Sequence, residues 1–322
     1  MPSMRIKVKG NESGVYHCMS RVVGKEHLLG RLEREVFRKM LWQLADFSGL
    51  EVLTYAVMSN HFHVLVRVPG GREVDDVELV RRVGVLYGSE RASWVEKGLR
   101  GAGGEGLREG YLLRMGDVSQ YMKSLKQRFS IWYNRRSGRV GTLWSERFKS
   151  VLVEGSGTAL RTVSAYIDLN AVRGGLCEDP KDYRYCGYGE AMGGSVRARW
   201  GLGVVMEHGD WGMASREYRM ILFGKGYYAG TGKGVMSWEQ WCEVRERGGR
   251  LALADALRCR VRYLSEGTVL GSRAYVEGCF EANREKFGQR RESGARALRG
   301  AEWGGLCSVR DLRRRVYTMR DS

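Results

Sequence analysis

The sequence lacks paired cysteines, long apolar runs and a phosphate-binding loop, and each absence excludes a class of protein. Its seven cysteines are scattered, odd in number and never in a CxxC pair. This arrangement indicates neither a zinc site nor a disulfide framework, and it suits a reducing cytoplasm. No apolar run is long enough to span a bilayer, and residues 1–14 lack the apolar stretch of a signal peptide. No GxxxxGK[ST] loop for a nucleotide is present.

Acidic residues are also too few to balance the basic ones. The 322 residues include 54 Lys and Arg against 37 Asp and Glu, a formal net charge of +17. Such a balance points to a polyanionic partner, most commonly nucleic acid. An anionic membrane is the rival partner, but it would require a basic amphipathic helix or an apolar anchor. With 43% hydrophobic residues, the chain can still form a sizeable core.

Hydrophobic periodicity predicts alternating strands and helices in the first 190 residues. Strands are expected where β-forming residues cluster, at 15–23, 51–58, 61–69 and within 141–155. Amphipathic helices are expected at 28–49, 117–136 and 158–175. Only Ser59 and Asn60 separate the second and third strands, which suits a tight hairpin. The order βαββαβ predicts an α+β fold of the ferredoxin-like sandwich type.

Two regions depart from this pattern. Residues 70–111 are rich in glycine and charge, and we interpret them as an insertion or lid, with a short helix at 76–87 and a flexible loop at 98–106. A change in composition near residue 190 predicts a boundary between a domain 1–190 and a mostly helical domain 191–322, with 193–203 as linker. Helices of the second domain are expected at 211–226, 237–248, 251–267 and 272–288.

Two of the five histidines lie in the stretch SNHFHVLV, residues 59–66. Because side chains alternate along a strand, His61 and His63 point to one face and Phe62 to the other. Two neutral imidazoles side by side can form two corners of a metal site. The alternative is a pair of histidines on a polar face with no ligand.

The helix expected at 158–175 offers further candidates. Tyr166 and Asn170 are four residues apart and therefore share a helix face. Asn170 can supply a carbonyl oxygen to a metal, and a tyrosine beside a metal-bound phosphate can act as a nucleophile. The alternative is that Tyr166 is a core tyrosine and Asn170 an ordinary residue of the helix end.

Basic residues are densest in residues 114–150, where nine Lys and Arg face two acidic residues. We expect these cations to follow the phosphates of a nucleic acid. The candidates for DNA binding are Lys123, Lys126, Arg128, Arg135, Arg136, Arg139, Arg147 and Lys149. The interleaved aromatics Trp132, Tyr133, Trp144 and Phe148 could stack on bases, but burial in the core is the default for such side chains. A second basic stretch, 284–299, is either another DNA contact or a disordered tail.

Three stretches together resemble the single-tyrosine HUH transposases, in particular the REP-associated tyrosine transposases. They are MSNHFHVLV, MKSLKQRFSIWYNRRSGRVGTLWSERFKSVLVE and YIDLNAVRGGL, and the resemblance covers about residues 14–190. It implies a ferredoxin-like catalytic fold and a divalent metal, Mg²⁺ or Mn²⁺, held by His61 and His63. It further implies that Tyr166 cuts single-stranded DNA at hairpin-associated sites through a 5′-phosphotyrosine, and that Asn170 completes the metal site.

The same resemblance implies a bacterial protein of the nucleoid and leaves a homodimer open, because family members are often dimeric while some act as monomers. Three functions compete: an active strand transferase, a domesticated relative that binds hairpins without cutting, and an RNA-binding module on the same fold. The joint presence of His61, His63 and Tyr166 favours the first. We interpret Tyr121 and Tyr133, on the preceding helix, as packing or base-stacking residues.

Overall fold

The four strands expected in the first 190 residues are neighbours in one sheet. A computed structural model of the chain describes residues 6–8, 12–71, 73–224, 252–309 and 317–318. Strands β1 (Gly14–Arg21), β2 (Glu51–Val57), β3 (His61–Val68) and β4 (Lys149–Val153) lie in the order β2-β3-β1-β4. Each adjacent pair among them is antiparallel. The expected α+β class and the β2–β3 hairpin are confirmed.

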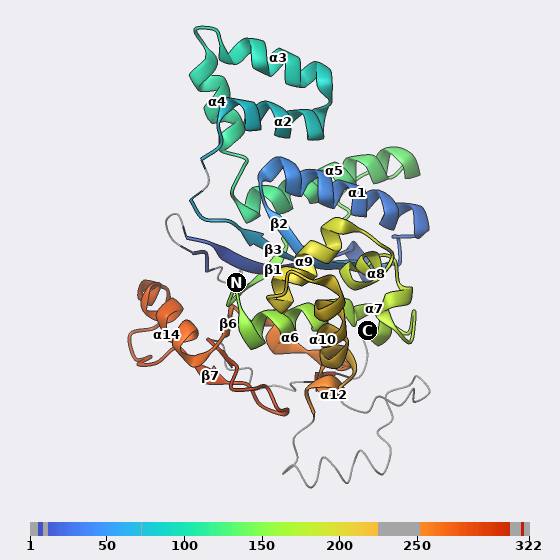
Figure 1. Ribbon diagram of the computed structural model, residues 1–322, viewed down its shortest axis with the longest axis vertical. Coiled ribbons are helices and arrows are strands. Elements are labelled where there is room, and N and C mark those ends of the chain that lie inside the picture. Colours follow the sequence, from blue (N-terminus) through green and yellow to red (C-terminus); the bar gives the residue numbers. More distant parts are fainter. Residues whose placement is uncertain (1–5, 9–11, 72, 225–251, 310–316, 319–322) are drawn as a thin grey trace.

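Helices cover both faces of this sheet (Figure 1). Helices α1 (Arg31–Ser48) and α5 (Val118–Ser137) pack on one face, where the Phe37 ring of α1 lies 4.5 Å from the Phe62 ring of β3, centre to centre. Helix α6 (Gly157–Asp168), followed by the short α7 (Asn170–Arg173), lies on the other face. The expected helix 158–175 is therefore two helices, interrupted at Leu169. Because Phe62 turns towards α1, His61 and His63 turn towards α6.

The residues from 269 onward extend the sheet beyond β4. Strand β6 (Val269–Gly271) pairs in parallel with β4, and β8 (Cys307–Ser308) pairs with both β6 and β7 (Arg296–Ala297). The full order is β2-β3-β1-β4-β6-β8-β7. The expectation of a mostly helical region after residue 190 was therefore incomplete, because these strands continue the N-terminal sheet. The basic stretch 284–299 contributes β7, and its Ala295 and Leu298 are buried.

The remaining C-terminal elements are shorter than expected. The helix expected at 251–267 is instead α12 (Leu253–Leu257), β5 (Arg260–Val261) and α13 (Arg262–Glu266), and β5 pairs with β9 (Tyr317–Thr318). Helix α14 (Arg273–Glu281) occupies the first part of the helix expected at 272–288. Single 3-10 turns lie at Val23–Lys25, Pro180–Asp182 and Arg284–Lys286. The helix expected at 237–248 lies outside the described residues.

The linker expected at 193–203 is a helix instead. Helix α8 (Gly187–Met192) leads into α9 (Val196–Met206) and then α10 (Trp211–Phe223), and α9 packs against β2. A Cβ at Gly201 would lie 2.5 Å from the carbonyl oxygen of Leu53. The glycine thus permits a close approach of helix and strand, rather than the flexibility that composition suggested. The hydrophobic core is continuous across residue 190, from Ile6 to Val309.

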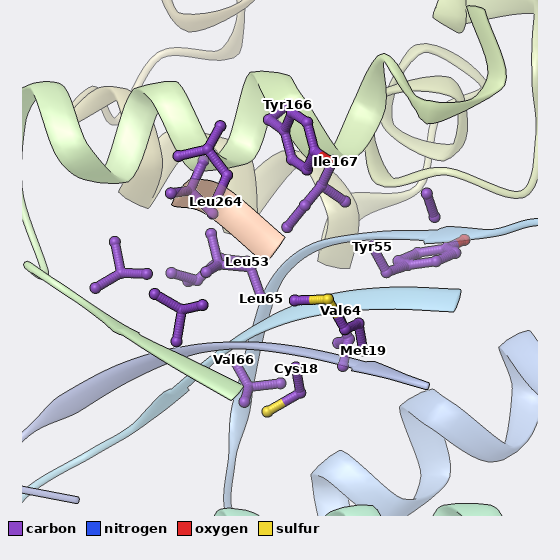
Figure 2. Packing of buried hydrophobic residues seen from close by; sticks show 14 of the residues in the cluster. Cys18, Met19, Leu53, Tyr55, Val64, Leu65, Val66, Tyr166, Ile167 and Leu264 are labelled. Atoms are coloured by element: carbon purple, nitrogen blue, oxygen red, sulfur yellow. The ribbon is translucent and has the colours of Figure 1, made fainter. Parts of the chain in front are cut away.

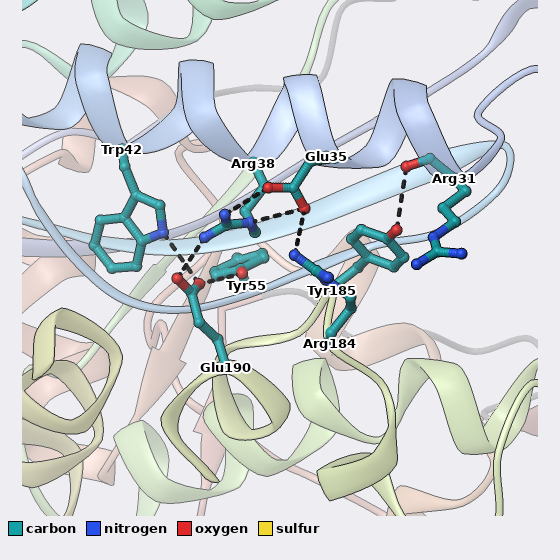
Figure 3. A network of polar contacts seen from close by, with 8 residues as sticks. All are labelled: Arg31, Glu35, Arg38, Trp42, Tyr55, Arg184, Tyr185 and Glu190. Atoms are coloured by element: carbon teal, nitrogen blue, oxygen red, sulfur yellow. Dashed lines mark hydrogen bonds and ion pairs between the residues drawn. The ribbon is translucent and has the colours of Figure 1, made fainter. Parts of the chain in front are cut away.

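Glu190 of α8 ties this segment to α1 and β2 (Figure 3). Its carboxylate accepts hydrogen bonds from Arg38 Nη1 at 2.6 Å, from Trp42 Nε1 at 3.1 Å and from the hydroxyl of Tyr55. Burial raises the pKa of Tyr55 well above its ordinary value, and the neighbouring Glu190 carboxylate adds to the rise. The tyrosine therefore stays protonated and remains a donor to Glu190.

The insertion 70–111 forms three helices, α2 (Asp76–Tyr87), α3 (Ser89–Leu99) and α4 (Gly104–Leu112), which project beyond α1 and α5 (Figure 1). They enclose a small apolar cluster of their own with Phe47 of α1. The loop expected at 98–106 is confined to residues 100–103, because packing of Tyr111 outweighs the low helix propensity of the glycines. No helix within the described ranges is long and apolar enough to cross a membrane.

Candidate active site

A chain of hydrogen bonds fixes the orientation of His63. His17 of β1 lies on the same sheet face, with its Nε2 at 2.8 Å from His63 Nδ1 and its Nδ1 at 2.9 Å from the carbonyl oxygen of Leu264. Burial lowers the pKa of His17 to about 4 and that of His63 well below its ordinary value. Both rings are therefore neutral at pH 7. His17 was not identified from the sequence as a site residue, although it lies within the strand predicted at 15–23.

His61 is held by its neighbour in the hairpin. Its Nδ1 lies 2.6 Å from Asn60 Oδ1, and the Asn60 amide nitrogen donates to the carbonyl oxygen of Lys25 at 3.2 Å. The second bond assigns the oxygen of the Asn60 amide to the side of His61, so His61 Nδ1 donates. A neutral His61 ring then has its lone pair on Nε2. The His61 and His63 rings lie 5.3 Å apart, centre to centre, and nearly perpendicular.

Tyr166 stands on α6 opposite the histidines. Its ring centre lies 6.2 Å from that of His63, and only 2% of the residue is exposed. The Arg173 guanidinium lies 4.0 Å from the ring centre, and it donates to the carbonyl oxygens of Tyr166 and Leu257, each at 2.8 Å. No residue in the described ranges forms a hydrogen bond with the Tyr166 hydroxyl. The ring is thus fixed while its hydroxyl keeps its bonding capacity.

Asn170 lies one helical turn after Tyr166, as the four-residue spacing predicts. Its amide nitrogen donates to the carbonyl oxygens of Ile167 at 3.0 Å and Tyr166 at 3.4 Å. These two bonds leave Oδ1 without a hydrogen bond within the described part of the chain. The orientation of the amide therefore presents an oxygen, rather than a nitrogen, for contacts outside the helix.

One pocket of about 250 Å³ is lined by His61, His63, Tyr166 and Asn170. Its wall carries four cations and two carboxylates: Arg21, Arg147, Lys149, Arg260, Glu146 and Glu266. The surplus of positive charge suits a phosphate group. Burial alone would raise the pKa of Glu266, but a hydrogen bond from Arg262 and the positive charges of Arg262, Arg260 and Lys149 lower it. Glu266 thus stays ionised and partly offsets the cations.

The pocket contains donor types that a divalent metal can use, namely imidazole nitrogens and an amide oxygen. Within the described residues, no group of three or more His, Cys, Asp or Glu side chains could hold a metal ion. A metal would therefore depend on His61, His63 and the amide oxygen of Asn170. His17 is not available, because both of its ring nitrogens already form hydrogen bonds, with His63 Nδ1 and with the carbonyl oxygen of Leu264. Two imidazole nitrogens with one amide oxygen suit Mn²⁺ better than Mg²⁺, which prefers oxygen ligands.

The eight cations predicted to bind DNA divide between the two sides of the sheet. Arg147 and Lys149 line the pocket, and Lys126 Nζ donates to the carbonyl oxygen of the adjacent Glu146 at 2.7 Å. Lys126 itself and the remaining five cations belong to α5 or to the turn after it, in the layer of α1: Lys123, Arg128, Arg135, Arg136 and Arg139. Arg136 and Arg139 lie 3.9 Å from the carboxylates of Glu33 and Glu26.

Most of the tyrosines and aromatic residues singled out in the basic stretch are buried, whereas Trp132 is only partly buried. Tyr121 is fully buried on α5 and donates to the carbonyl oxygen of Leu41 at 3.2 Å. Tyr133, Trp144 and Phe148 are also buried. The expectation that the aromatics belong to the core is confirmed for these three.

Asp168 anchors the helix that carries Tyr166. It is fully buried and accepts hydrogen bonds from Thr54 Oγ1 of β2 at 2.9 Å, Tyr218 Oη of α10 at 2.5 Å and the Tyr188 N–H of α8 at 3.0 Å. Burial raises the pKa of Asp168 to about 6, although these donors pull it down. One side chain therefore connects α6 to three other elements. The sequence contains no signal for it beyond its place two residues after Tyr166.

Comparisons with known proteins found a weak structural similarity. No model of a protein family matches the chain, and no curated protein matches it. Among solved structures, the chain is similar to that of a REP-associated tyrosine transposase bound to a REP hairpin. The identity is 14%, the TM-score is 0.40, and the match covers 62% of this chain and 90% of the other.

Proposed function

We propose that this protein is a metal-dependent endonuclease and strand transferase for single-stranded DNA, with Tyr166 as its nucleophile and hairpin-associated sequences as its targets. The observation that carries the proposal is the meeting of His61, His63, Tyr166 and Asn170 in one cationic pocket. These residues come from two segments about a hundred positions apart. In the same proposal, β1 to β4 with α1 and α5 form a ferredoxin-like unit that presents the histidines on the face that α6 covers.

The chain's own groups would divide the work as follows. Arg147 and Lys149 attract the DNA backbone and hold the scissile phosphate in the pocket. The packing of Arg173 on the Tyr166 ring holds the phenol in place. His61, His63 and Asn170 would bind Mn²⁺ or Mg²⁺, which when bound polarises the phosphate and offsets its negative charge. Tyr166 Oη then forms a bond to phosphorus while the bond from phosphorus to the 3′-oxygen breaks.

Atoms and charge balance without a further reactant. The Tyr166 hydroxyl loses its proton, the leaving 3′-oxygen gains one, and the DNA 5′ end remains on the tyrosine as a phosphodiester. A 3′-hydroxyl from another DNA end can attack this bond in the reverse sense and rejoin the strand. Because one phosphodiester replaces another, no ATP is needed, in agreement with the lack of a GxxxxGK[ST] loop.

The test is incubation of the chain with end-labelled single-stranded DNA that flanks a hairpin, in the presence of Mn²⁺, followed by a denaturing gel. We expect a covalent adduct that disappears in Tyr166→Phe and persists in Tyr133→Phe, a matched loss of one hydroxyl from a buried ring. An adduct in Tyr166→Phe would contradict the assignment of the nucleophile. Hairpin binding without any adduct would instead favour the alternative of a non-catalytic DNA- or RNA-binding protein.

A further inference from the structure

We propose that His17 is a positioning residue for His63, and that the carbonyl oxygen of Leu264 holds His17 in turn. The inference rests on the proposed function for its catalytic consequence, but its structural content can be tested without DNA. It assigns a part in the active site to a segment from the C-terminal half of the chain. That segment, residues 257–266, lies almost two hundred positions after the histidine pair.

The carbonyl oxygen of Leu264 determines which atom donates in each of the two hydrogen bonds of His17. A carbonyl oxygen can only accept, so the bond to Leu264 requires a proton on His17 Nδ1. The neutral His17 ring then has a lone pair on Nε2, and His63 Nδ1 must donate to it. His63 consequently has its lone pair on Nε2. Metal-binding histidines commonly donate their second ring nitrogen in this manner, which fixes both tautomer and ring orientation.

Close packing restricts the orientation of the His17 and His63 rings. His17 is fully buried, and its ring lies 5.0 Å from that of His63, centre to centre, at an interplanar angle of 29°. His17 and His63 are diagonal neighbours on one sheet face, because Met19 is the residue directly opposite His63. Figure 2 shows Leu264 in the same buried cluster as Leu65 of β3 and Tyr166 of α6. Solvent therefore cannot readily replace the Leu264 carbonyl as acceptor.

The same segment also reaches the tyrosine. The carbonyl oxygen of Leu257 accepts from Arg173, whose guanidinium covers the Tyr166 ring. Ser265 and Glu266 line the pocket itself. Two main-chain carbonyls seven residues apart thus accept hydrogen bonds from His17, which contacts His63, and from Arg173, which covers the Tyr166 ring. This agreement strengthens the inference that the segment belongs to the site rather than to a neighbouring domain.

The first measurement uses the unmodified chain, labelled with ¹⁵N and free of metal and DNA. With only five histidines, long-range ¹H–¹⁵N correlation can resolve every ring. We expect His17 and His63 both to carry the proton on Nδ1, with a scalar coupling across the bond from His63 Nδ1 to His17 Nε2. A proton on Nε2 of His63 would overturn the proposal, whether or not any variant folds.

The second measurement uses substitutions of His17. His17→Phe keeps a ring and removes the acceptor, so His63 should lose its Nδ1–H preference and Mn²⁺ affinity, read by electron paramagnetic resonance, should fall about 10- to 100-fold. His17→Gln restores an acceptor near the position of Nε2 and should recover most of that affinity. His208→Gln, a change at a partly exposed histidine that does not line the pocket, serves as control and should leave both readouts unchanged.

The outcomes separate this inference from the proposed function. An unchanged His63 tautomer and Mn²⁺ affinity in folded His17→Phe would overturn it, even if the wild-type chain cuts DNA. Conversely, the expected tautomers and affinity changes would uphold it even if the wild-type chain forms no DNA adduct, in which case only the proposed function fails. Loss of affinity in His17→Gln equal to that in His17→Phe would indicate a packing role alone and would also overturn it.

Discussion

Replacing Asp168 by Asn should change how the stability of the protein depends on pH. Burial raises the pKa of this carboxyl from an ordinary value of 3.8 to about 6 in the folded chain. Between these values the native state keeps a proton that the unfolded state has lost. The free energy of unfolding must therefore decrease as pH rises through this window, and the stabilisation of the protonated form is gone above the folded pKa. Asp168→Asn cannot take part in this decrease.

The magnitude follows from the size of the shift. A rise of about two pKa units corresponds to about 3 kcal/mol, and the full burial of Asp168 calls for no reduction by solvent screening. The substitution also weakens the bonds from Thr54, Tyr218 and Tyr188, at a cost of about 1–3 kcal/mol. Because that cost changes little with pH, it cancels when the difference between wild type and variant is compared at two pH values.

Urea denaturation of both proteins at pH 4 and pH 7 measures this double difference. Relative to Asp168→Asn, we expect the wild type to lose about 2–3 kcal/mol of unfolding free energy between the two pH values. A difference of the opposite sign would show that the three donors outweigh burial and hold the pKa low. If the difference between wild type and variant is the same at both pH values, the Asp168 carboxyl has the same pKa in the folded and unfolded states. That result would also refute the reasoning.

Further predictions concern the stability of the fold and the residues that contact DNA. Glu190→Ala leaves three donors without an acceptor and should lower the unfolding free energy by about 3 kcal/mol, whereas the exposed control Glu146→Ala should change it by less than about 1 kcal/mol. A chain that ends after Glu190 should fail to fold, because β4 loses β6 and β2 loses α9; a stable, protease-resistant product would instead confirm the boundary predicted at that residue. Arg147→Ala should flatten the slope of log K for single-stranded DNA against log salt by about one, while Arg135→Ala, on the opposite side of the sheet, should not; equal effects would mean that DNA contacts both sides.

Periodicity in the sequence was sufficient for the central elements. The strands β1, β2 and β3 and the helices α1 and α5 lie within a few residues of their predicted positions, because alternation and the 3.6-residue repeat reflect which side of each element is buried. The same two periods brought His61 and His63 to one face and Tyr166 and Asn170 to another. That these faces meet in one pocket also required the crossing of α6 over the sheet, which only the family resemblance implied.

The remainder depended on contacts that no local pattern encodes. Helix α9 was predicted as a linker because glycine signals flexibility in a sequence, whereas Gly201 serves a close contact with the backbone of Leu53. The role of His17 requires the register of β1 against β3, and its partner on the other side is a main-chain oxygen, which has no signature in a sequence. The roles assigned to Tyr166 and to the metal ligands stay predictions until the adduct and the bound metal are measured.

The place of β6 beside β4 also bears on how the protein is made. A ribosome releases β1 to β4 long before residues 269–271, so the nascent chain passes through a stage in which β4 offers an unpaired edge. An open edge can recruit a strand from another molecule and start aggregation. The strand that closes this edge directly follows the segment 257–266 that reaches the pocket, and the chain is exposed to self-association until β6 has been synthesised.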